Sequence, residues 1–285
     1  MTIKKFVEQL KAKLSSKEFW KYFFAAVGTI SSVVTLISFV FQLQDPGCTV
    51  IVIYVLGVVG LSVAFAVLQT WRKKSLDLRI SNTLRVKVAE GDIFSYSKDE
   101  NYVVIPVNEY FDTIVDNKII NKSTIHGQFI LKYYKDNHAK LHEEIEAYFK
   151  ANNINGKPEE RNESKGHNIK YSLGTCAIIN KDNTNFVLLA LTHFDNEDHA
   201  YVELSEFGRA ISEMCKTLAD KVQDKPVYMP LMGMGMSRLN QSGQFILKYT
   251  LDTIVGIKDL ALLGGVNIVV YPPVAKTLNL NEIKY

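Results

Sequence analysis

The sequence predicts an α/β protein in which a two-helix transmembrane hairpin is followed by a mixed sheet flanked by helices. The first observation is a pair of long uncharged stretches within the first quarter of the 285 residues. Each is longer than the roughly 20 residues that a helix needs to cross a bilayer. The second is that short apolar runs then alternate with stretches of helical spacing, the pattern of a sheet covered by helices. The third is a glycine-rich turn between one such run and the next helix.

The transmembrane hairpin is expected over residues 19–74, with spans at about 22–43 and 49–71. A tight turn containing Pro46 and Gly47 separates the spans, and Trp20 and Trp71 stand at their outer ends, where interfacial aromatic residues are found. A signal peptide would have a shorter apolar region and a cleavage site. The helical hairpin of a soluble core is the other alternative, but two charge-free runs of this length are rare there, which favours the membrane.

Basic residues flank the hairpin on one side of the membrane. Six lysines precede the first span and Arg72, Lys73 and Lys74 follow the second, whereas the turn carries only Asp45. The positive-inside rule therefore predicts a two-pass membrane protein with both termini in the cytoplasm. Residues 1–18 have apolar side chains on one helical face and lysines elsewhere, which predicts an amphipathic cytoplasmic segment lying on the membrane lipid.

Neither span contains an ionisable residue. Transporters and selective channels usually need polar groups at membrane depth, so a monomer with these two helices is not expected to form a pore. Any action in the membrane therefore requires a homo-oligomer. Gly28 with Ser31, and Gly57 with Gly60, would allow close helix contacts, although small residues are equally well tolerated in a simple anchor.

Composition excludes several classes of function. The net charge of +3 does not indicate nucleic acid as a partner. The three cysteines are widely spaced and form no Cys/His ligand pattern, so neither a disulfide framework nor a metal site is predicted. A base and a nucleophile do not occur together at any local spacing, so no catalytic residue is predicted and the chain is not expected to be an enzyme.

Residues 76–285 form the predicted soluble domain, a normal length for one domain. Strands are expected at 84–90, 102–107, 171–179, 185–192, 227–231 and 267–271. Helices are expected from Ile125 onward and at 139–151, 205–222 and 244–260, with Ser205 as one N-cap. The polar stretch 152–168 contains glycine and proline and is interpreted as an exposed insertion.

A glycine-rich turn joins the strand at 227–231 to the following helix. It contains Gly233, Met234, Gly235, Met236, Ser237 and Arg238. Glycines let a backbone approach a ligand closely, and several N–H groups can then point at one phosphate. An ordinary tight turn would use the same glycines, and one face of the alternating methionines is expected to pack in the core. Arg238 is either a solvated charge or a phosphate partner.

The order of these motifs resembles that of macro domains, which bind ADP-ribose. Gly91, Asp92 and Ile93 after the first strand resemble that family's GDI turn, whose aspartate receives the adenine amino group. The strand ending at Asn108 resembles the strand that enters the ribose-side loop, and the turn after 227–231 resembles the loop around the diphosphate. The resemblance covers about residues 84–273 and implies a macro-like fold that binds an ADP-ribose derivative, with no further cofactor.

Two features refine the resemblance. Macro-domain hydrolases carry a second asparagine and a run of glycines after the second strand, whereas this chain reads Glu109, Tyr110, Phe111 and Asp112 there. Binding is therefore expected rather than hydrolysis, and a membrane-tethered ADP-ribosyl hydrolase or an anchored scaffold are the alternatives. The order of amphipathic segment, membrane hairpin and macro-like domain also resembles the membrane effectors of Thoeris-type antiphage systems in bacteria.

That second resemblance implies a function by analogy. A partner TIR-domain enzyme would make an ADP-ribose-derived signal such as histidine-ADP-ribose. The membrane protein would sense the signal, oligomerise and disrupt the inner membrane, which gives abortive infection. The residues expected to bind this signal are Asp92, Ile93, Asn108, Phe111, His126, Gly127, Gly233, Met234, Gly235, Met236, Ser237 and Arg238.

Overall fold

The computed structural model describes residues 14, 17–40, 48–69, 75–135, 137–161, 166–195, 197, 199–222, 224–235 and 239–285. The chain forms two compact units, Met1–Lys73 and Lys74–Tyr285. Most of the predicted amphipathic segment, the turn between the predicted spans, and the three residues from Met236 to Arg238 lie outside the described residues.

The described residues of the first unit form the helices α2 (Lys17–Val40) and α3 (Cys48–Gln69), which pack against each other. Val58, Ser62 and Ala66 are buried on α3, and their spacing of four residues is that of one helical face. Most large apolar side chains described on the rest of α3 are exposed, Leu56 and Leu68 by about two-thirds of their surface. This unit therefore presents an apolar exterior.

One helical stretch within the described residues, Ile51–Leu68, is long and apolar enough to cross a membrane, with a mean hydropathy of 2.7. The helix α2 does not meet the same criterion among these residues. The prediction of two spans is therefore not confirmed, and one such helix also occurs in soluble cores and signal sequences.

The second unit is built on a mixed sheet of eight strands within the described residues. The strands are β1 (Ser75–Arg79), β2 (Leu84–Glu90), β3 (Tyr102–Asn108), β6 (Cys176–Lys181), β7 (Thr184–Phe194), β8 (Ala200–Tyr201), β9 (Val227–Pro230) and β10 (Leu262–Val270). Their order is β1-β2-β10-β9-β3-β7-β6, and β8 pairs with β7. Neighbours from β2 to β7 pair in parallel, whereas β1, β6 and β8 pair antiparallel.

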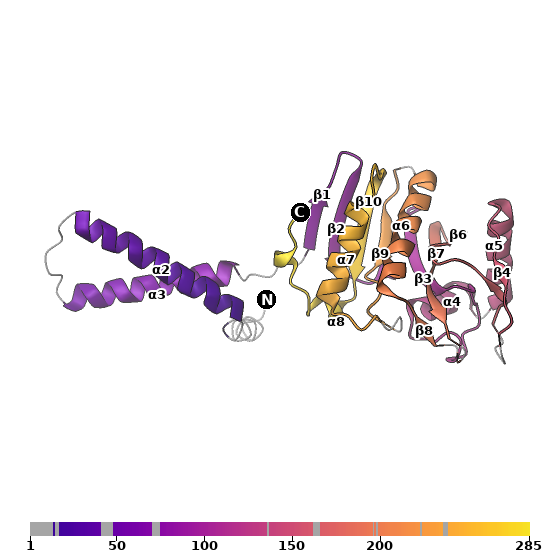
Figure 1. Ribbon diagram of the computed structural model, residues 1–285, viewed down its shortest axis with the longest axis horizontal. Coiled ribbons are helices and arrows are strands. Elements are labelled where there is room, and N and C mark those ends of the chain that lie inside the picture. The colour runs from indigo at the N-terminus through magenta and orange to yellow at the C-terminus, as the bar shows by residue number, and fades with distance from the viewer. Residues whose placement is uncertain are drawn as a thin grey trace. The chain divides into compact units, whose positions relative to one another are not determined.

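Helices cover both faces of this sheet, as the alternation of the strands predicts. On one face α6 (Leu204–Lys221) and α7 (Gly243–Val255) pack with Val104 and Val187, and both helices lie in front of the sheet in Figure 1. On the other face α4 (Ile125–Tyr134) and α5 (His138–Ala151) pack with Val103 and Phe186. The expected mixed sheet flanked by helices is confirmed.

Smaller elements complete the second unit. They are η1 (Ile93–Tyr96), the hairpin of β4 (Lys157–Pro158) with β5 (Ile169–Lys170), α8 (Pro272–Ala275) and η2 (Leu280–Glu282). The strand β4 lies in the stretch 152–168 that the sequence suggests is an exposed insertion, and β5 follows directly after it. That interpretation is wrong for Arg161, whose side chain is 8% exposed and pairs with a buried carboxylate.

Several boundaries differ from the sequence prediction for local reasons. Ser205 is not an N-cap, because α6 begins one residue earlier and its N-cap is Glu203, without a side-chain capping bond. The last strand is longer than 267–271 and contains Gly264, whose backbone lies so close to Lys225 that a Cβ there would be 2.2 Å from its carbonyl carbon. The same glycines interrupt the apolar run, so the start of this strand was not predicted from the sequence.

Candidate functional site

A cavity of about 830 Å³ opens at the carboxyl ends of the parallel strands. Each of these strands contributes from its last residues or from those just after it: Asp92 follows β2, Asn108 ends β3, Thr192 lies near the end of β7, Met232 follows β9 and Tyr271 follows β10. Ligands of open α/β sheets bind in the crevice at this edge. The volume also lies within the range of small-molecule sites.

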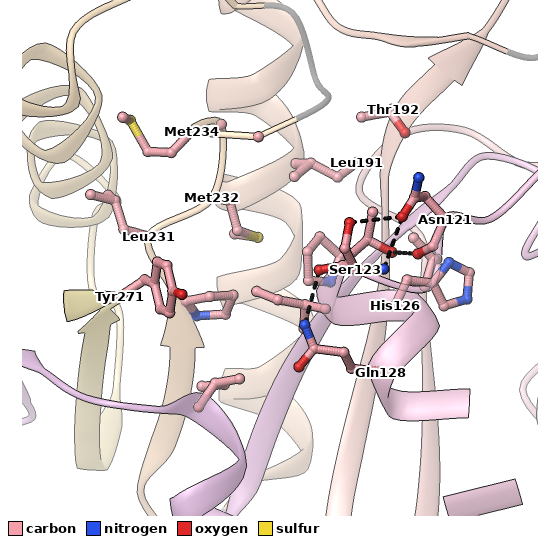
Figure 2. A pocket seen from close by; sticks show the side chains of 18 of the residues that line it. Asn121, Ser123, His126, Gln128, Leu191, Thr192, Leu231, Met232, Met234 and Tyr271 are labelled. Carbon is pink, nitrogen blue, oxygen red and sulfur yellow. Dashed lines mark hydrogen bonds between the residues drawn. The ribbon is translucent and has the colours of Figure 1, made fainter. Parts of the chain in front are cut away.

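Figure 2 shows a polar wall of the cavity facing an apolar wall. The polar side chains come from the loop before α4 and its first turn: Asn121, Ser123, His126 and Gln128. The apolar side chains come from the segment after β9: Leu231, Met232 and Met234. Tyr271 lies beside them. A ligand with both hydrogen-bonding groups and an apolar ring would suit such a division.

The turn after β2 places a carboxylate at the cavity. Asp92 is the N-cap of η1, and its Oδ1 accepts a hydrogen bond of 3.0 Å from the Phe94 backbone N–H. The side chain is exposed, whereas Ile93 is 5% exposed and packs in the core while it also lines the cavity. Asp92 is the only carboxylate on the lining within the residues that the structure describes.

Asn108 ends β3 and is 4% exposed. Its Oδ1 accepts from the backbone N–H groups of Tyr110 (3.0 Å) and Asp112 (3.3 Å), and its Nδ2 donates to Asp112 Oδ2 (3.1 Å). Both lone pairs of the amide oxygen and one of the two amide hydrogens are thereby used. Toward the cavity Asn108 can offer one N–H donor, which suits a hydroxyl or phosphate oxygen.

Phe111 and Gly127, which the sequence predicts to bind the ligand, are not among the residues that line the cavity. Phe111 adopts a positive φ of 51° and is 1% exposed, with its ring packed edge-on against Phe149 and Tyr171. Gly127 lies in the first turn of α4, where a Cβ would be 2.4 Å from the Asn121 carbonyl oxygen. Its role is to let α4 approach the preceding loop, so both residues support the cavity from behind.

The glycine-rich turn after β9 lines the cavity with Gly233, Met234 and Gly235. Gly233 has a φ of +84°, which L side chains rarely adopt, and a Cβ there would be 2.7 Å from the Leu239 Cδ1 atom. A Cβ on Gly235 would meet no atom of the described residues within 4 Å. The two glycines therefore have different roles: the first is needed for the shape of the turn, and the second leaves open space at the cavity.

The loop before α4 is a part of the lining that the sequence prediction missed. Thr124 caps the helix by accepting from the Gly127 backbone N–H (3.0 Å), and its hydroxyl donates to the Asn121 carbonyl (2.7 Å). Asn121 Oδ1 accepts from the Ser123 backbone N–H (2.9 Å), and Gln128 donates to the Ser123 carbonyl (2.9 Å). The start of α4 thus presents its positive dipole end to the cavity. In the sequence, Ser123 or Thr124 as a candidate N-cap is the signal for this helix start.

His126 lies on the polar wall and is 7% exposed. Burial lowers the pKa of His126 from its ordinary 6.5 to about 3. The imidazole is therefore neutral at physiological pH and offers one donor and one acceptor nitrogen. It adds no positive charge to the site.

The lowered pKa of His126 predicts how stability depends on pH. His126 binds a proton more readily in the unfolded chain than in the folded one. The free energy of unfolding is therefore unaffected by His126 above pH 6.5 and decreases as the pH falls from 6.5 toward 3. We expect His126→Gln to remove about 2 kcal/mol of the decrease in unfolding free energy between pH 7 and pH 5. Denaturant titrations of the full chain in detergent at the two pH values measure this. An equal decrease in wild type and variant would contradict it.

The acidic residues that follow β3 are not available for chemistry at the cavity. Glu109 is fully buried, with His193 Nδ1 at 2.5 Å and Lys170 Nζ at 3.4 Å. Asp112 is also fully buried and pairs with Arg161. Neither side chain lines the cavity. The arrangement can bind a small molecule.

Comparisons with known proteins identify the family of the second unit. The family described as Thoeris protein ThsA, Macro domain, matches residues 86–271. The Thoeris protein ThsA of Bacillus amyloliquefaciens (strain Y2) is 32% identical over 240 residues, which is 82% of this chain and 76% of that protein.

Solved macrodomain structures are also similar. The Oceanobacillus iheyensis macrodomain with ADP aligns with a TM-score of 0.44 and 12% identity over 71% of this chain and 91% of that one. A mutant of the same macrodomain with ADPR gives a TM-score of 0.45 and 12% identity over 71% and 93%. From the family match and the curated relative, this chain belongs to the Thoeris ThsA family and carries the ThsA Macro domain over residues 86–271.

Proposed function

We propose that this protein is a membrane effector of bacterial antiphage defence that senses an ADP-ribose-derived signal. A TIR-domain enzyme supplies the signal, of which histidine-ADP-ribose is one candidate. Binding drives homo-oligomerisation and disruption of the inner membrane, which gives abortive infection. The observation that carries the proposal is the cavity of about 830 Å³ lined by the Asp92 turn, Asn108 and the Gly233 to Gly235 turn.

The chemistry of the cavity supports a nucleotide of this kind. The Asp92 carboxylate accepts hydrogen bonds and suits an adenine amino group. The start of α4 and the backbone of the turn around Gly235 offer N–H groups to a diphosphate, without needing a cationic side chain. Asn108 donates one N–H to a ribose oxygen. The apolar wall with Tyr271 provides surface for a ring.

Calorimetric titration of the full chain in detergent tests the proposal. Ligands to compare are ADP-ribose, histidine-ADP-ribose and NAD. We expect Asp92→Ala to weaken binding of the best ligand by about 10- to 100-fold, because a hydrogen bond to a charged group contributes about 1.5–3 kcal/mol. Asp220→Ala, which removes an exposed carboxylate on α6, is the matched control. Folded protein that releases no heat with any of these ligands would end the sensor proposal.

We further propose that α2 and α3 anchor the protein in the inner membrane with both termini in the cytoplasm. The basic residues before α2 and after α3 support this orientation. We expect reporters fused to either terminus to report a cytoplasmic location. A periplasmic reporter at one terminus would contradict a two-pass arrangement, since two spans return the chain to the side on which it started.

The competing function is an ADP-ribosyl hydrolase tethered to the membrane. Such an enzyme would release ADP-ribose from a modified protein at substoichiometric amounts. We expect no turnover, because the carboxylates after β3 are held in ion pairs away from the lining. A scaffold without nucleotide binding would show neither turnover nor heat of binding, so the two assays distinguish all three functions.

A further inference from the structure

A buried ion pair lies directly behind the wall of the cavity. Its acid is Asp112, in the loop that follows β3, and its base is Arg161, from the insertion between α5 and β5. The Arg161 Nη1 atom lies 2.9 Å from Oδ2 and 3.0 Å from Oδ1 of Asp112. The exposed fractions of the two side chains are 8% and 0%. The insertion is thereby fixed to the loop that carries Asn108.

The carboxylate of Asp112 depends on this partner. An ionised group buried without compensation is strongly unfavourable, and the loss of one partner of a buried pair leaves the other uncompensated. Asp112 also accepts from the His167 backbone N–H (2.6 Å), and Arg161 donates to the His167 carbonyl (3.0 Å). Both partners of the pair therefore bond to the His167 backbone in the insertion. Without Arg161, a position closer to water would be more favourable for the charged Asp112 carboxylate.

Asn108 links this pair to the cavity. Asp112 Oδ2 accepts from Asn108 Nδ2, and the Asp112 backbone N–H donates to Asn108 Oδ1. These bonds fix which way the amide of Asn108 points, and they leave its second N–H for a ligand. A displaced Asp112 side chain would remove the acceptor of one amide N–H and leave the Tyr110 N–H on Asn108 Oδ1, so the direction of the second N–H would be less well fixed.

Phe194 provides a second link. The guanidinium of Arg161 lies 4.2 Å from the centre of the Tyr110 ring and 5.5 Å from the centre of the Phe194 ring, distances at which a cation is attracted to an aromatic face. Phe194 lines the cavity, whereas Arg161 does not. The same side chain therefore supports two lining residues from behind, through an ion pair in one case and a ring contact in the other.

Gly166 indicates how closely this arrangement is packed. A Cβ at this position would lie 2.2 Å from Arg161 Nη1 and 2.4 Å from Asp112 Oδ1. Any larger residue must displace one partner of the ion pair. The insertion thus contributes both the arginine and the glycine that allows the pair to form.

We propose that Arg161 is a positioning residue for the ligand cavity, which holds Asn108 and Phe194 in the orientation that binds the nucleotide. This inference rests on the proposed function of the cavity. The insertion that carries Arg161 is then a working part of the sensor rather than a tolerated surface loop.

Titration of the full chain with ADP-ribose tests the role of Arg161. We expect Arg161→Ala to weaken binding by about tenfold or more, and Arg161→Lys, which keeps the charge but lacks the planar guanidinium, to give an intermediate loss. Arg85→Ala is the matched control, because it removes an arginine from another Arg–Asp pair that is exposed and away from the lining. We expect its binding to equal that of wild type.

A double-mutant cycle separates positioning from general stabilisation. If Arg161 acts through Asn108, the loss caused by Arg161→Ala should be clearly smaller when Asn108 is already alanine, since residues in one network are not additive. Gly166→Ala provides a variant that keeps both charges, and we expect it to weaken binding as well. It also decides the question if Arg161→Ala does not fold.

The outcomes separate this inference from the proposed function. Wild-type protein that binds ADP-ribose, together with unchanged binding by folded Arg161→Ala or Gly166→Ala, overturns the inference alone. Strictly additive losses in the cycle also overturn it, because they give Arg161 a purely structural role. Wild-type protein that binds no ADP-ribose derivative overturns the proposed function and this inference together.

Discussion

Gly235→Glu should abolish binding of the nucleotide, with a loss of more than about 100-fold in affinity. Gly235 lines the cavity next to the open space in which we place the diphosphate. A glutamate there would bring a negative charge against the phosphates, and like charges placed together across an interface cost several kcal/mol. Titration calorimetry with ADP-ribose or histidine-ADP-ribose on the full chain measures the loss.

Gly235→Ala is the control that separates charge and bulk from the mere loss of glycine. A Cβ at this position meets no described atom within 4 Å, so alanine should bind nearly as well as wild type. Gly233→Ala should instead harm the turn, because Gly233 has a positive φ and is crowded by Leu239. Tight binding by Gly235→Glu would show that the phosphates do not lie beside this turn.

The sequence predicted those parts of the fold that depend on local pattern. The strands β2 and β3 were recognised because apolar residues alternate or run continuously there, and α4 because Ser123 or Thr124 before it could serve as an N-cap; the structure shows that Thr124 does. The start of β10 was missed because Gly264 and Gly265 interrupt its apolar run, although the sheet accepts them beside the neighbouring backbone. Both membrane spans were predicted from composition alone, and among the described residues only the helix at Ile51–Leu68, within the second predicted span, meets that criterion.

The sequence predicted those lining residues that lie in a short segment with a recognisable pattern of its own. Asp92, Asn108, His126 and the turn from Gly233 to Gly235 all line the cavity, whereas the ligand-binding role of each stays a prediction. Phe111 has a positive φ and its ring packs in the core, so its ligand-binding role also stays a prediction. Lining residues such as Asn121, Thr192 and Tyr271 come from distant segments that only the strand order brings together, and spacing along the chain does not contain that order.

The burial of Arg161 could not be predicted from the sequence either. Its stretch is polar and contains glycine, which is typical of an exposed loop. The Arg161 side chain is buried because it pairs with the Asp112 carboxylate, which lies 49 residues earlier in the chain, in the loop after β3. A charge pair of this separation leaves no local pattern, so it becomes visible only when both partners are placed on the fold.

Ligand should cause leakage of liposomes that carry the full-length protein, and protein without ligand should leave them sealed. From Tyr22 to the end of α2, and throughout α3, the sequence has no Asp, Glu, Lys or Arg, so these stretches offer a nucleotide no charged partner. A ligand shifts an association equilibrium only by its difference in affinity between the two states. We therefore expect occupancy of the cavity to favour an oligomer, in which several apolar hairpins come together and compromise the bilayer.

Dye release and sizing of the detergent-solubilised protein, each with and without ADP-ribose or histidine-ADP-ribose, measure the two steps separately. Gly235→Glu is the matched control, because its helices are unchanged while its cavity is blocked, so it should neither assemble nor release dye. For release to follow from binding, both must rise over the same range of ligand concentration. Tight binding that changes neither the size of the complex nor the leakage would refute this mechanism, because a ligand with equal affinity for monomer and oligomer shifts nothing however tightly it binds.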